Sequence, residues 1–92
     1  MSYSKEQMLH DYYWTDSISA VYTGSPSRRL FDPKNGVQVL FIINCFCDSL
    51  GLASEKEYRN LEELIHSQLP ADTKSELAVF NWLKGIYLYH AN

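Results

Sequence analysis

One nearly uncharged run, GVQVLFIINCFCDSLG from Gly36 to Gly51, constrains the fold more than any other segment; its only charged residue is Asp48. If the run forms a helix, with a rotation of about 100° per residue, its apolar side chains include a stripe along one face. On that stripe lie Val39, Ile43, Phe46 and Leu50, bordered by Ile42 and Cys47. A second apolar set, Val37, Phe41 and Cys45, falls on the other side. A helix that is apolar on two faces must lie centrally in its domain or form half of an oligomer interface.

The alternative for this run is a β-strand, because valine, isoleucine and phenylalanine favour strands. The length of the run argues against it, since a usual strand has about 5–6 residues. Gly51, the last residue of the run, also stands where glycine commonly follows the end of a helix. The run is shorter than the roughly 20 apolar residues needed to cross a bilayer, so no membrane span is expected.

The 92 residues correspond to one domain with a modest core. The net charge of −3 and the pI of about 5.5 disfavour general nucleic-acid binding, which usually needs a basic face. Aromatic residues make up 14% of the chain, more than a small core readily hides. Some of the tyrosines and tryptophans are therefore candidates for a binding surface.

The rest of the chain indicates an all-α fold, a small antiparallel bundle of three to four helices. The predicted helices span about 5–22, 36–50, 54–69 and 73–89. Capping boxes support three of the starts, with Ser4, Ser54 and Thr73 as N-caps and Gln7, Glu57 and Glu76 three residues later. The segment TDSISAVYTG, residues 15–24, fits either a helix or a strand, with helix favoured, and the choice between them stays open for residues 15–31. Short connections make the last three helices antiparallel neighbours, with Ile43 and Leu64 expected to be fully buried.

One long loop is predicted at 24–36, where glycine, proline and asparagine supply turn chemistry. It contains the only adjacent basic pair of the chain, Arg28 and Arg29. Long loops in compact domains are often functional. This loop is therefore the first candidate for a contact surface.

No motif for catalysis, a metal or a cofactor is present in the sequence. The three histidines are far apart, and the paired glutamates fit a solvated helix face. Cys45 and Cys47 point about 200° apart on a helix and cannot bridge, so free buried thiols are expected. Free thiols and the polar first ten residues predict a cytoplasmic protein.

These observations predict a non-catalytic protein that binds another protein and occludes its functional surface. Inhibitor, immunity, phage anti-defence and adaptor proteins are of this kind. The predicted partner-binding residues are Tyr13, Trp14, Arg28, Arg29, Trp82 and Tyr89. A homodimer through Val37, Phe41 and Cys45, or coverage of that face by the N-terminal segment, is also expected. The alternative is a DNA-binding regulator, because the last two helices imitate a helix-turn-helix, although the last one offers only Asn81 and Lys84 for base contacts.

Overall fold

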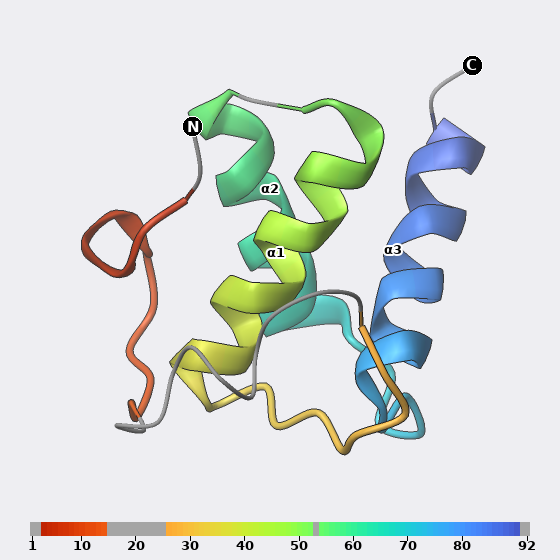
Figure 1. Cartoon of the computed structure of the whole chain (residues 1–92), viewed down its shortest axis with the longest axis horizontal. Coiled ribbons are helices and arrows are strands. Elements are labelled where there is room, and N and C mark those ends of the chain that lie inside the picture. Colours follow the sequence, from red (N-terminus) through yellow and green to blue (C-terminus); the bar gives the residue numbers. More distant parts are fainter. Residues whose placement is uncertain (1–2, 15–25, 53, 91–92) are drawn as a thin grey trace.

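The computed structural model describes residues 3–14, 26–52 and 54–90. Its helices are one 3-10 turn, η1 (Lys5–Gln7), and three α-helices, α1 (Gly36–Leu50), α2 (Glu55–Gln68) and α3 (Glu76–His90). The predicted small all-α bundle is confirmed. Successive α-helices run in opposite directions, and α1 packs against both α2 and α3 (Figure 1). Among the described residues, no helix is long and apolar enough to cross a membrane.

Both ends of α1 follow from local chemistry. Asn35 is the N-cap, and its side-chain Oδ1 accepts a hydrogen bond from the Val37 amide at 3.1 Å. At the other end Gly51 has φ 71°, the left-handed conformation that glycine adopts without strain. The Leu52 amide then donates to the Cys47 carbonyl at 2.8 Å, which closes the helix with a Schellman-type bond.

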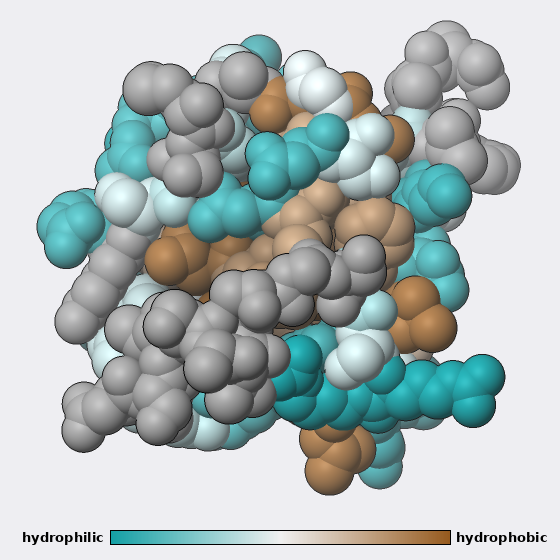
Figure 2. Space-filling model, viewed as in Figure 1, coloured by the Kyte–Doolittle hydropathy of each residue, from teal (hydrophilic) through white to brown (hydrophobic). Residues whose placement is uncertain are grey.

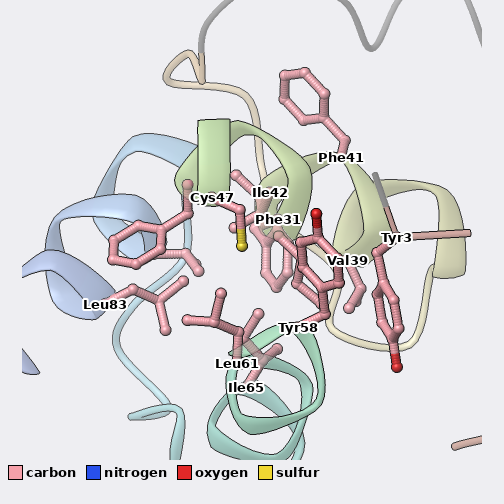
Figure 3. Close-up of a cluster of buried hydrophobic side chains, with 13 residues drawn as sticks. Tyr3, Phe31, Val39, Phe41, Ile42, Cys47, Tyr58, Leu61, Ile65 and Leu83 are labelled. Atoms are coloured by element: carbon pink, nitrogen blue, oxygen red, sulfur yellow. The ribbon is translucent and has the colours of Figure 1, made fainter. Parts of the chain in front are cut away.

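The core lies where the three α-helices meet (Figure 3). The predicted stripe of α1 is correct for Val39, Ile43 and Phe46, which have no exposed surface. It is wrong for Leu50, which is 39% exposed, because the chain turns at Gly51 and Leu52 packs against the core instead. Leu61 and Ile65 of α2 and Leu83 of α3 complete the buried centre.

The predicted helix over 5–22 is wrong where it can be compared. Only Lys5–Gln7 is helical, residues 8–14 form an irregular segment, and residues 15–22 lie outside the described part. The capping contact at Ser4 does form, since its amide donates to Gln7 Oε1 at 3.0 Å. Beyond it, the backbone pairs with distant elements rather than with itself: the Tyr13 amide donates to the Lys34 carbonyl at 3.0 Å. Tertiary contacts thus override a weak local preference for helix.

The described part of the predicted loop, residues 26–35, runs along the start of α3. The Phe31 amide donates to the Lys74 carbonyl at 2.8 Å, and the Glu76 amide donates to the Arg29 carbonyl at 2.9 Å. These bonds delay the start of α3 from the predicted Thr73 region to Glu76. Ser75, not Thr73, is the effective cap, because its Oγ accepts from the Ala78 amide at 3.1 Å.

Candidate functional site

A buried carboxylate, Glu62 on α2, holds the N-terminal segment against the bundle. The Tyr3 and Tyr12 hydroxyls donate to it at 2.7 and 2.8 Å. The amides of Leu9 and His10 donate to it at 2.9 and 3.0 Å. Glu62 has no exposed surface; its bond from Tyr3 is buried, and the bonds from Leu9, His10 and Tyr12 are partly buried.

These bonds also set the charge state of Glu62. Burial by itself raises the pKa of the carboxyl, but the hydrogen bonds from two hydroxyls and two amides outweigh it, and the pKa is lowered. Burial and the neighbouring carboxylate raise the pKa of Tyr3 and Tyr12. Glu62 is therefore an ionised group whose oxygens are already occupied, which suits a structural clamp better than acid–base chemistry.

A second buried carboxylate, Glu76, holds the 27–31 segment in the same manner. Arg29 Nε lies 3.1 Å from Glu76 Oε2, and Gln38 Nε2 donates to the same oxygen at 3.1 Å. The Ser27 amide reaches the other oxygen at 3.3 Å. The two clamps fix both irregular segments to the helices.

A histidine pair lies beside the first clamp. The rings of His10 and His66 stack with centroids 3.6 Å apart, and His10 Nε2 is 2.8 Å from Glu63 Oε1. Parallel stacked rings do not direct their nitrogens at a common ion. Within the described residues, no group of three or more histidine, cysteine, aspartate or glutamate side chains is placed to hold a metal.

The two cysteines are free thiols, as their spacing predicts. Cys47 is buried, and burial raises the pKa of its thiol to about 12. Burial also raises the pKa of Cys45, which is partly buried. Both thiols are protonated at neutral pH, and a protonated thiol is a poor nucleophile and metal ligand.

The candidate binding site is an open groove of about 760 Å³ between α2 and α3. The groove exists because both helices pack on α1 more closely than on each other. Its apolar lining consists of Leu52, Leu64, Ile86 and Tyr87. Its polar lining consists of Glu57, Asn60, Glu63, Ser67 and Gln68.

Contacts to neighbouring groups fix both carboxylates of the groove. The Tyr87 hydroxyl of α3 donates to Glu57 Oε2 of α2 at 2.8 Å and so links the two walls. His10 Nε2 lies 2.8 Å from Glu63 Oε1. Among the described lining residues, the two charged side chains are both acidic.

Of the six predicted partner-binding residues, the five whose side chains the structure describes do not line this groove. Tyr13 is 51% exposed, and its hydroxyl bonds the Asp32 carboxylate. The Trp14 ring packs so closely over Gly36 that an added Cβ would lie 2.5 Å from it. Tyr13 and Trp14 contact the beginning of α1, and Arg29 contacts the beginning of α3. Trp82 is partly buried against the core, and the Tyr89 side chain lies outside the described part of the structure.

The two arginines, Arg28 and Arg29, differ in their exposure and in their contacts. Arg28 is exposed, whereas Arg29 is bound to the buried Glu76. Next to them, Leu30 is 76% exposed, which is unusual for a leucine this close to a buried network. Arg28 and Leu30 therefore place a basic and an apolar side chain at the surface of this loop.

The predicted dimer face is largely covered within the single chain. Val37 and Phe41 are 4% and 9% exposed, and Cys45 is partly buried. Phe41 points away from the main cluster, to the other side of α1 (Figure 3). Nearby, the Tyr3 amide donates to Asn44 Oδ1 at 2.8 Å, so the N-terminal segment contacts α1. The homodimer stays a prediction.

Sequence reasoning missed the groove. It predicted that Leu64 is fully buried, but Leu64 is only partly buried and lines the groove together with Ile86 and Tyr87. The available signal was the width of the apolar surface on the last two helices, which exceeds what one neighbouring helix covers. Comparison of the chain with protein-family models, with curated proteins and with solved structures finds no match.

Arg29 is expected to contribute to stability rather than only to binding. Arg29→Ala leaves the buried Glu76 carboxylate without its cation and should lower the free energy of unfolding by about 2 kcal/mol. Arg28→Ala removes an exposed side chain and should change it by less than about 0.5 kcal/mol. Urea denaturation of both variants checks this. Equal stabilities would contradict the clamp.

Proposed function

We propose that this protein is a small non-catalytic binder that inhibits or regulates another protein by occluding its functional surface. The α2–α3 groove is the proposed contact site. An apolar groove with a few fixed polar groups is a common form of binding site. Immunity, phage anti-defence and adaptor roles all fit this mechanism. The cytoplasm is the proposed location because the chain has two free thiols.

The remaining chemistry supports binding better than catalysis. Among the described residues, the most buried carboxylates, Glu62 and Glu76, are occupied by hydrogen bonds from their own chain. The described ring contacts of the histidine pair are the stacking of His10 on His66 and the pairing of His10 with Glu63, and neither brings a serine or cysteine to the imidazoles. Because the Glu62 and Glu76 clamps hold the irregular segments in place and the groove is open, the protein is suited to bind a partner as a rigid scaffold.

The DNA-binding alternative has weaker support. In a helix-turn-helix, the first residues of the recognition helix contact the bases. Here the start of α3 is covered by the 27–31 segment, since the Leu77 amide donates to the Ser27 carbonyl at 2.9 Å and Glu76 is buried. Farther along α3, Asn81 and Lys84 are exposed but no arginine is present. A protein partner therefore fits better than a DNA groove.

Photo-crosslinking in the native host tests the proposal. A photoreactive amino acid at Ser67, which lines the groove, should capture a specific protein, whereas the same group at Arg59 on the outer side of α2 should not. With the captured protein purified, Ser67→Trp should weaken its binding by at least about tenfold, because the indole fills the groove. Arg59→Trp is the matched control.

Other outcomes would contradict the proposed site or the proposed class. Capture at Arg28 but not at Ser67 would move the interface to the loop. Binding of random duplex DNA that weakens steeply with salt would favour the regulator instead.

A further inference from the structure

We infer that the α2–α3 groove takes an amphipathic helix whose apolar face is flanked by lysine or arginine. This inference rests on the proposed function, because it names the chemistry of the partner at the same groove. It depends on three properties of the described residues: the course of the groove, its apolar lining and the sign of its charges.

The course of the groove suits a helix. The α2 residues that line it, from Glu57 through Asn60 and Leu64 to Gln68, recur every three or four positions. They therefore form one face of α2 over about three turns, a length of roughly 16 Å. A second helix lying along this face would pack between α2 and α3 on the side that α1 leaves open.

The shape of the site argues against other peptide conformations. Strand addition needs a sheet edge with free backbone groups, and the walls here are helices whose backbone groups bond internally. Polyproline ligands dock on surfaces built from several aromatic rings, but among the described lining residues Tyr87 is the only aromatic one. Helix-in-groove recognition remains, with apolar anchors every three to four residues.

The charges of the groove select a basic helix. Both charged lining residues, Glu57 and Glu63, carry carboxylates, and no lysine or arginine is among the described lining residues. The chain as a whole has a net charge of −3. Basic side chains beside the apolar face of a partner would meet these carboxylates, whereas acidic ones would be repelled. A second copy of this acidic chain is a poorer electrostatic match.

Synthetic peptides test the inference on the full-length protein. The probe is a fluorescent helical peptide of about 15 residues with leucines on one face and lysines beside them. One control peptide replaces every lysine by glutamate, and another scrambles the order so that no apolar face forms. Fluorescence anisotropy should show that the lysine peptide binds at least about tenfold more tightly than either control.

Variants locate the binding. Ser67→Trp should weaken binding of the lysine peptide by about tenfold or more. Glu63→Gln should weaken it about threefold, in line with an exposed charge pair, and high salt should remove that difference. Glu55→Gln, an exposed glutamate of α2 that does not line the groove, is the matched control and should leave binding unchanged. Asn60→Arg gives a second blocking variant if Ser67→Trp lowers the melting temperature.

Several results would overturn the inference. These are equal or tighter binding of the glutamate peptide, lysine-peptide binding that both blocking variants leave unchanged, and a homodimer in light scattering that Ser67→Trp dissociates. Capture of a partner at Ser67 without binding of the lysine peptide would contradict the basic helix but leave the proposed function intact. Failure of both experiments would contradict both.

Discussion

Glu62→Ala is expected to destabilise the protein by about 3–5 kcal/mol, a large share of the stability of a small domain. The substitution removes the acceptor for two hydroxyls and two backbone amides, of which the Tyr3 hydroxyl is buried and the other three donors are partly buried. Each unsatisfied buried donor costs about 1–3 kcal/mol when no other partner is available. The loss should exceed that of any exposed substitution on α2.

Substitutions of increasing severity distinguish the loss of the Glu62 hydrogen bonds from nonspecific destabilisation. Tyr12→Phe removes one of the bonds and should cost about 1 kcal/mol. Glu62→Gln keeps the shape but presents an amide to two backbone donors, so it should fall between Tyr12→Phe and Glu62→Ala. Urea denaturation gives the ranking, and hydrogen exchange should show lost protection at the Leu9 and His10 amides. If Glu62→Ala melts within a few degrees of wild type, the clamp does not hold the fold.

Acid should reproduce part of this effect. The pKa of Glu62 is lowered below its ordinary value of 4.5 in the folded state, so the folded protein binds this proton less readily than the unfolded chain. The stabilisation is complete well above the ordinary value and declines as the pH falls through it toward the lowered folded pKa. The stability difference between wild type and Glu62→Gln should therefore shrink below about pH 4.5.

The parts of the fold that the sequence predicts are those fixed by local chemistry. The Ser54 cap and the glycine after α1 each set a boundary through neighbouring backbone groups. Periodicity likewise identifies Val39, Ile43 and Phe46, because a helix repeats its buried face without reference to the rest of the chain.

The failures occur where distant residues decide the structure. Residues 8–14 have helix-compatible periodicity, but their amides find acceptors on Glu62 and Lys34, which lie far along the chain. Glu62 itself looks like one of two adjacent glutamates on a polar helix face, and nothing local indicates that it is buried. The groove was missed for the same reason, since it depends on how far α2 and α3 stand apart.

Ile43→Ala is the second substitution for which a large effect is expected, about 2–5 kcal/mol of unfolding free energy. Ile43 is fully buried at the junction of the helices, so the deleted methyl and methylene groups leave a cavity that rigid neighbours cannot close. Leu50 provides the matched control, because helical periodicity places it on the same stripe. In the structure it is 39% exposed, and Leu50→Ala should cost less than about 1 kcal/mol.

Leu64→Ala adds a third point to the same comparison. Leu64 lines the groove and is partly buried, so its truncation should cost an intermediate amount, about 1–2 kcal/mol. Thermal and urea unfolding of the three variants measure the order Ile43, Leu64, Leu50. Equal losses of unfolding free energy at Ile43 and Leu50 would support the prediction from helical periodicity that both side chains are buried, with the end of α1 inside the core. A loss at Leu64 as large as at Ile43 would mean that the groove is closed in solution, and a partner helix would then have to open it before it binds.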